Sequence, residues 1–254
     1  LLRAGPPPPK VALLPDAAFF TRAVAVTAGA TPGEAATQIE LALEGLAPFP
    51  LSQLYYGWHW RPGAEQALLF AAYRRRFTAE QSAEWQGAEI VLPAFGAVLG
   101  ASLEPATTVL LSSPESLTAV HWGANGEPSA VQTRTIEAGA SEEERARVKS
   151  ELIASLGGSR RVIESSGEPA PEPAGNDGSF IFRAGELVSR LPATAAAAAD
   201  VRDKAELAAL RAARRRDVVL WRTAVGLAAS LVALAAGELA LVGGRVWQGT
   251  REGR

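Results

Sequence analysis

Short apolar segments alternate with polar ones over the first 136 residues of the chain, and this pattern predicts β-strands joined by turns. Segments 54–60 and 66–73 are separated by a Pro-Gly turn signal, so together they predict a β-hairpin. Segments 107–111 and 117–122 predict a second strand pair. The other expected strands are 11–14, 18–26 and 130–136.

Two segments carry the signals of helix ends. Thr31 is followed by Pro32 and Glu34, which is typical of a capping box with proline at the first helical position. A second helix is expected between Ser141, a cap followed by three glutamates, and Gly157. Strands interspersed with helices predict an α/β fold with a mixed sheet.

A long apolar segment near the C-terminal end, residues 223–244, predicts a transmembrane helix. It holds 22 residues, and its only charged residue is Glu238. A helix of that length extends about 33 Å, and a bilayer's hydrocarbon layer is about 30 Å thick. Trp221 and Trp247 bracket the segment, as aromatic residues do at membrane interfaces. A buried helix of a soluble domain is the alternative.

Small residues recur along this predicted span at three- and four-residue spacing, so the helix is expected to pack against itself or another membrane helix. Glu238 adjoins this stripe and needs a partner or a proton in lipid. The stripe consists of Ala229, Ala233, Gly237, Ala240 and Gly244.

Arginines flank the predicted span unequally. Five precede it and three follow it, which favours a membrane crossed once with the N-terminal domain on the cytoplasmic side. The flanking residues expected at the membrane surface are Arg214, Arg215, Arg216, Trp221, Arg222, Arg245 and Trp247.

Composition changes between these parts and defines the expected organisation. Residues 164–178 contain no apolar side chain larger than alanine or proline, so they predict a flexible loop or linker. The expected parts are a proline-rich lead-in (1–10), an α/β domain (11–163), the linker (164–178), a short strand with a helical stalk (179–216), the membrane helix with its flanks (217–247) and the start of a truncated distal region (248–254).

Catalytic and metal chemistry find little support in the sequence. The 254 residues include no cysteine, and the two histidines, His59 and His121, sit in apolar strands without carboxylates at ligand spacing. No Gly-x-Ser-x-Gly motif occurs. The net charge of −2 gives no field that attracts nucleic acid. We therefore expect no enzyme, no metal, no cofactor and no nucleic-acid partner. Alternate aromatic residues in segment 54–60 are expected to be core.

One set of motifs in the first 75 residues resembles a known family. Pro15-Asp16 closes the first strand, Arg22 lies in the second, Glu40 lies in the helix, and Tyr55 follows a Pro-Phe-Pro-Leu turn. That turn consists of Pro48, Phe49, Pro50 and Leu51. In this order and spacing, the motifs resemble the actin-like pilus-assembly proteins of type IV pilus systems and the cytoplasmic L component of type II secretion.

The resemblance implies a truncated actin-like, ribonuclease-H-like domain on the cytoplasmic side of a bacterial inner membrane, which the chain crosses once. In that family the phosphate loop has the form Asp-x-Gly followed by Ser or Thr. The matching position here, after strand 107–111, reads Ser112-Ser113-Pro114-Glu115 and lacks both the aspartate and the glycine. The resemblance therefore favours the secretion L component, a scaffold that binds platform proteins such as an assembly ATPase. An ATP-binding actin-like pilus ATPase and an unrelated tail-anchored protein are the alternatives.

Overall fold

The computed structural model describes residues 8–85, 87–137, 139–165, 167–175, 177–209, 216, 219–227 and 230. The chain forms two compact units, Leu1–Asp203 and Lys204–Arg254. In the second unit, residues 204–209 and 219–227 are helical.

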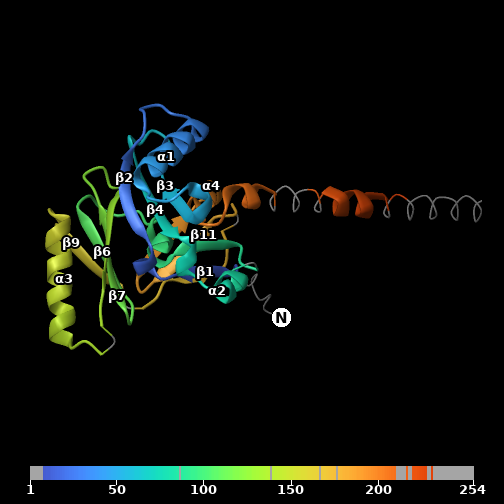
Figure 1. Ribbon diagram of the computed structural model, residues 1–254. Helices are drawn as coiled ribbons and strands as arrows, with labels where there is room; N and C mark the ends of the chain where they lie inside the picture. The colour runs from blue at the N-terminus through green and yellow to red at the C-terminus, as the bar shows by residue number, and fades with distance from the viewer. Residues whose placement is uncertain are drawn as a thin grey trace, which may run out of the picture. The chain divides into compact units, whose positions relative to one another are not determined.

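The first unit is a mixed α/β fold with four sheets (Figure 1). Its strands are β1 (Val11–Leu14), β2 (Phe20–Ala25), β3 (Leu54–His59), β4 (Gln66–Tyr73), β5 (Ile90–Pro93), β6 (Thr107–Ser112), β7 (Ser116–Trp122), β8 (Pro128–Thr135), β9 (Arg161–Ser165), β10 (Ala170–Glu172), β11 (Phe180–Ala184) and β12 (Leu187–Leu191). Its helices are α1 (Pro32–Leu46), α2 (Ala79–Glu84), α3 (Glu142–Leu156) and α4 (Ala193–Ala199). Short 3-10 turns are η1 (Asp16–Ala18), η2 (Leu51–Gln53), η3 (Arg74–Arg76) and η4 (Ala94–Val98).

The sheets combine antiparallel hairpins with two parallel pairs. The order β2-β4-β3 contains the predicted hairpin, and β8-β7-β6-β9 contains the predicted pair β6–β7. β1 runs parallel to β5, and β6 runs parallel to β9. Strands β10, β11 and β12 form a separate antiparallel sheet.

Both predicted helix starts are confirmed. Thr31 and Glu34 form a reciprocal capping box at α1, and Ser141 accepts a hydrogen bond from the Glu144 N–H at α3. α1 contacts β2 and β4, and α3 contacts β7 and β8 (Figure 1). Each helix buries its apolar stripe against the sheet beneath it.

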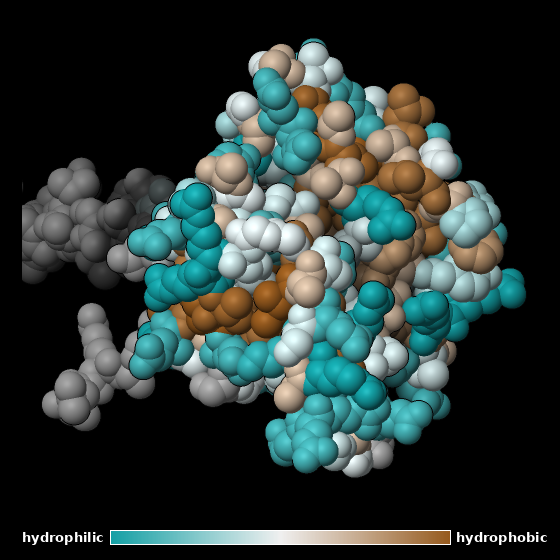
Figure 2. Space-filling view, turned by 90° about the vertical axis from the view of Figure 1, so that its left-hand side faces the viewer, coloured by the Kyte–Doolittle hydropathy of each residue, from teal (hydrophilic) through white to brown (hydrophobic). Residues whose placement is uncertain are grey.

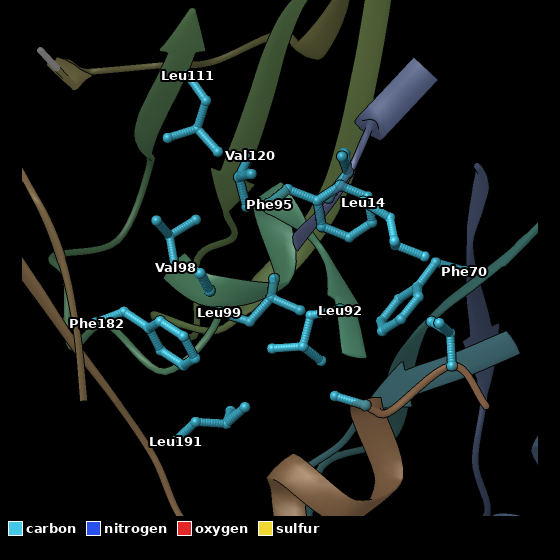
Figure 3. Packing of buried hydrophobic residues seen from close by; sticks show 14 of the residues in the cluster. Leu14, Phe70, Leu92, Phe95, Val98, Leu99, Leu111, Val120, Phe182 and Leu191 are labelled. Carbon is cyan, nitrogen blue, oxygen red and sulfur yellow. The ribbon is translucent and has the colours of Figure 1, made fainter. Parts of the chain in front are cut away.

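The largest apolar cluster lies where the sheets meet (Figure 3). Phe70 from β4 and Phe95 from η4 meet edge to face, with ring centroids 5.3 Å apart. Phe182 and Leu191, from the β10-β11-β12 sheet, are fully buried in the same cluster. Residues 180–191 are therefore part of this core.

A second cluster lies between α1 and the β2-β4-β3 sheet. Tyr56 and Trp58 are both 8% exposed there, and their rings stack. The prediction that the alternate aromatic residues form core is confirmed for Tyr56 and Trp58, whereas Trp60, the third of them, is only partly buried against the cluster. On the side of the unit that carries α3, hydrophilic residues cover most of the lower part, and hydrophobic residues gather in separate smaller areas (Figure 2).

The prediction of a flexible linker at 164–178 is wrong in two places. Strand β9 extends to Ser165, and Ala170–Glu172 form β10, which pairs with β11. These residues lack large apolar side chains, but strand pairing uses the backbone, which every residue supplies. Part of the segment is therefore regular strand, which its amino-acid composition does not predict.

The predicted stalk at 179–216 is also wrong in its first part. α4 ends at Ala199 instead of continuing to Arg216, and Val201 is fully buried in the largest cluster. The Val201 N–H donates to Val91 O at 3.0 Å, and its carbonyl accepts from the Tyr56 N–H at 3.0 Å. Tertiary pairing thus ends the alanine-rich helix.

In the described part of the chain, no helix combines the length and apolar character that crossing a bilayer needs. Of the predicted span, only residues 223–227 and 230 are described. The predictions for Arg214, Arg215, Ala229, Ala233, Gly237, Glu238, Ala240, Gly244, Arg245 and Trp247 lie outside the described residues.

Gly57 in β3 permits the close approach of the C-terminal end of α4. A Cβ built at Gly57 would lie 2.4 Å from the carbonyl oxygen of Ala199. We therefore expect Gly57→Ala to lower the free energy of unfolding by about 1–3 kcal/mol in urea titrations. Gly45→Ala in α1 is the control, because its Cβ would meet nothing within 4 Å. This substitution should raise the free energy of unfolding by up to about 1 kcal/mol, since alanine favours a helix over glycine. Equal effects of the two substitutions would contradict this packing.

Candidate functional site

A hollow of about 260 Å³ lies where the two parallel strand pairs end. Leu14 closes β1, Ala94 follows β5, Ser112 closes β6, and Gly167 follows β9 shortly after its end. Ligands of parallel α/β sheets bind at the carboxyl ends of the strands. This hollow is therefore the candidate site of the compact unit.

Two turns form parts of its wall. One is Pro15-Asp16, which leads from β1 into η1, and the other is the β6–β7 turn around Pro114. In the β6–β7 turn, the Ser113 N–H donates to Ser116 O at 2.9 Å, and the Ser116 N–H donates to Ser113 Oγ at 3.0 Å. The turn satisfies these two donors internally, so neither is free for an anion.

Asp16 is the buried polar group of the site, with 5% of its surface exposed. Its Oδ1 accepts a hydrogen bond from the Phe95 N–H at 2.9 Å. Burial raises the pKa of Asp16 to about 6, and hydrogen bonds from Phe95, Thr118 and Ala94 offset part of that rise. A carboxyl with this pKa is half protonated near pH 6 and mostly ionised at pH 7.

The charges that line the hollow are all acidic. Asp16, Glu115 and Glu168 contribute carboxyl groups, and none of its described lining residues is lysine, arginine or histidine. Pro15, Pro114 and Pro169 also line it, and proline has no N–H to offer. A phosphate group would meet like charge and few donors there.

The residues that carry the family resemblance do not come together in this hollow. Of them, only Pro15 and Asp16 line it. The hydroxyl of Tyr56 donates to Glu40 Oε1 at 2.9 Å, and Arg22 Nη1 donates to the neighbouring Thr21 O. These contacts are structural.

The Pro-Phe-Pro-Leu turn after α1 has a packing role as well. Its Phe49 ring stacks on Tyr73 at 4.2 Å between centroids, and Pro50 precedes η2, which begins at Leu51. Further along, Tyr55 lies against the rings of Phe77 and Trp85, and the Arg74 guanidinium sits 5.0 Å from its centroid. Pro48 separates α1 from this turn.

The two histidines occupy unrelated positions. His121 Nδ1 is 2.9 Å from Thr108 Oγ1, and burial lowers the pKa of His121. His59 is 5% exposed and lies 4.0 Å from Glu127. Within the described residues, no three histidine or carboxylate side chains gather as a metal site.

Sequence reasoning singled out Asp16 and the Ser112–Glu115 turn but missed the third side of the hollow. Gly167, Glu168 and Pro169 lie inside the segment predicted as a linker. These residues lie shortly after β9, which pairs in parallel with β6. The sequence does not reveal this pairing, so it gave no signal that they line the hollow.

Comparisons with known proteins find similarity among solved structures. No family model matches this chain, and no curated protein matches it. A solved structure similar to the chain is Cyto-EpsL, the cytoplasmic domain of EpsL, an inner membrane component of the type II secretion system of Vibrio cholerae. The TM-score is 0.38 and the sequence identity 17%, and the match covers 65% of this chain and 65% of that one, slightly less than two thirds. A similarity of this size supports no statement about function.

Replacing Asp16 tests the energetics of the hollow. The unfolded chain loses this proton near pH 3.8 and the folded chain near pH 6, so between these values the folded state binds more protons. Stability therefore falls as pH rises through this window, by a total on the order of 3 kcal/mol. We expect Asp16→Asn to be more stable than the parent near pH 7 and to lose that advantage towards pH 4 in urea titrations.

Glu168→Gln is the control for this prediction, because Glu168 lines the same hollow but is exposed. Its stability relative to the parent should not depend on pH in the same window. An Asp16→Asn variant that is less stable than the parent near pH 7 would show that the hydrogen bonds to the carboxylate outweigh its burial.

Proposed function

We propose that this chain is a non-catalytic scaffold of a type II secretion or type IV pilus assembly platform, anchored in the bacterial inner membrane. Its compact α/β unit binds partner proteins on the cytoplasmic side, and its C-terminal span fixes them at the membrane. The lining of the hollow carries this proposal, because it lacks the groups that a nucleotide needs. The sequence resemblance to the secretion L component supports the same reading.

The chemistry of the hollow argues against ATP. A triphosphate needs backbone donors, a cation or a bound magnesium ion. The described lining offers three carboxyl groups and no basic side chain, and Asp16 is committed to the Phe95 N–H. At about 260 Å³, the hollow also falls just below the usual ligand range of about 300–1,000 Å³.

The second unit supports membrane attachment. Val219, Leu220, Trp221, Val225 and Leu227 lie in its helical residues with 49% to 70% of their surfaces exposed. Exposed apolar residues grouped in this way are typical of a membrane or protein contact. Continued by the apolar sequence up to residue 244, they favour the bilayer.

The place where the chain leaves the compact unit supports a positioning role. Arg202 donates to both Asp200 carboxylate oxygens and to the carbonyl oxygens of Ala88 and Glu89. Arg74 Nη2 lies 3.0 Å from Asp203 Oδ2. These contacts bind the last residues of the first unit to its own strands and loops. The proposed partners include an assembly ATPase and other platform proteins.

One observation favours the alternative of an ATP-binding actin-like protein: the hollow lies at the carboxyl ends of parallel strands, as nucleotide sites do. Binding of magnesium ATP to the full chain, measured by isothermal titration calorimetry in detergent, decides between the two. We expect no saturable binding up to millimolar ATP. Micromolar binding that is lost in Asp16→Asn would overturn the scaffold assignment.

Membrane anchoring predicts resistance to alkaline carbonate extraction. We expect the full chain to stay in the membrane pellet, and the double variant Leu231→Arg with Leu234→Arg to move to the soluble fraction. Each arginine near the middle of a span costs about 2.5–3.5 kcal/mol of insertion free energy. Leu231→Ile with Leu234→Ile, which keeps the apolar character, is the matched control. Extraction of the parent chain by carbonate would contradict anchoring.

A further inference from the structure

The carboxyl groups that line the hollow have no basic partner. Asp16 is buried, whereas Glu115 and Glu168 are exposed. Among the described residues, no ion pair includes any of these three side chains. Asp16 is mostly ionised at pH 7, so the unit buries a negative charge without a counter-charge. Burying such a charge is costly, and a cation bound beside it would offset part of that cost.

Apolar residues share the lining with these charges. Leu14, Leu111 and Pro169 line the hollow and are buried, and Pro114 lines it as an exposed residue. A buried carboxylate together with apolar walls suits a ligand that has an apolar stem and a cationic end. Lysine and arginine side chains have this composition, because a row of CH₂ groups carries their charge.

The three carboxyl groups come from separate parts of the chain: the turn after β1, the β6–β7 turn and the residues after β9. Within the described residues, no three carboxylate or histidine side chains gather closely enough to surround a metal ion. A cation whose donors are spread out therefore suits the hollow better than a single point of charge. The planar guanidinium of arginine carries five N–H donors in a fork, whereas the ammonium of lysine is compact.

Asp16 can accept one more hydrogen bond. A carboxylate offers about four lone-pair sites, and donors from Phe95, Thr118 and Ala94 occupy three of them. The volume of about 260 Å³ lies just below the range of whole small-molecule ligands, so it suits a single side chain. The hollow thus offers one buried acceptor in a space of side-chain size.

We propose that the hollow binds an arginine side chain of a partner protein. This inference rests on the proposed scaffold function, because it names the chemistry by which a partner docks on the compact unit. The arginine stem lies along Leu14 and Leu111, and one guanidinium N–H donates to Asp16. The other N–H groups face the carboxyl groups of Glu115 and Glu168.

A partner protein fits the hollow better than free arginine does. Free arginine carries an α-carboxylate, and none of the described lining residues is basic and could bind it. Within a polypeptide, a neutral peptide bond replaces that carboxylate. Ser112, Pro114 and Gly167 are exposed residues of the lining, so the residues on either side of the arginine can contact them. Arginine is also among the residues that most often dominate protein interfaces.

Blocked amino acids test this inference on the full chain in detergent. The probes are arginine, citrulline and lysine with an acetylated amino group and a methylamidated carboxyl group, which mimic residues of a polypeptide. The readout is the amide NMR signals of Ser113, Ser116 and Gly167, in chains that carry isotope-labelled serine and glycine. We expect saturable shifts with a millimolar dissociation constant for blocked arginine, as its size allows. Blocked citrulline, the neutral isostere, should bind about ten-fold more weakly or worse. Equal binding of the two, or no saturable shift, overturns the inference.

Two further probes decide the class of ligand. Blocked lysine should bind several-fold more weakly than blocked arginine, and equal or tighter binding of lysine would contradict the choice of a guanidinium. Free arginine should also bind more weakly than blocked arginine. If it bound as tightly or more tightly, the hollow would be a small-molecule site, and the docking of a partner protein would be contradicted.

Substitutions test whether the probe binds in the hollow. Asp16→Asn, and separately the double variant Glu115→Gln with Glu168→Gln, should each weaken the binding of blocked arginine several-fold. Glu186→Gln, in the turn between β11 and β12 and outside the lining, removes the same charge and should leave the affinity unchanged. Unchanged affinity in either hollow variant overturns the inference. The scaffold proposal would survive that result, because ATP binding and carbonate extraction test it separately.

Discussion

Val201 joins two β-sheets through its backbone, and the arrangement of the compact unit depends on this contact. It donates to Val91 in β5 and accepts from Tyr56 in β3, both at 3.0 Å. Two residues earlier, the Ala199 carbonyl approaches β3 at a position that only Gly57 permits. Because Val201 is fully buried, leaving either backbone group unpaired would cost about 1–3 kcal/mol. Residues 199–201 thus belong to the core, and Arg202 and Asp203 are tied to the same unit by hydrogen bonds and an ion pair.

The candidate site depends on the same contact. β5 is held between Val201 on one side and β1 on the other, and β1 leads directly into the turn that carries Asp16. The Phe95 N–H that bonds Asp16 follows β5 in the chain. The acidic hollow and the exit of the chain towards its C-terminal unit are therefore built on neighbouring parts of one framework.

Local signals in the sequence were sufficient for the elements that rely on local chemistry. Thr31 and Ser141 cap helices through their own side chains, and the aromatic alternation at Tyr56 and Trp58 follows from the strand period. The elements that depend on distant partners were missed. β10 forms through backbone pairing with β11, and the alanine run after Pro192 stops at Ala199 because Val201 pairs with other strands. The hollow itself was not predicted: the sequence singled out Asp16 and the Ser112–Glu115 turn as motif positions, and Glu168 reaches the hollow only through the β6–β9 pairing.

Hydrogen exchange of the full chain, followed by mass spectrometry at single-residue resolution, tests the role of Val201 most directly. Amides that are bonded in the core exchange only when the core opens. The amides of Val201 and Tyr56 should therefore be protected as strongly as that of Leu69, which is fully buried in the middle of β4. Rapid exchange at Val201, with Leu69 still protected, would show that the segment is a loose connection and would contradict this account.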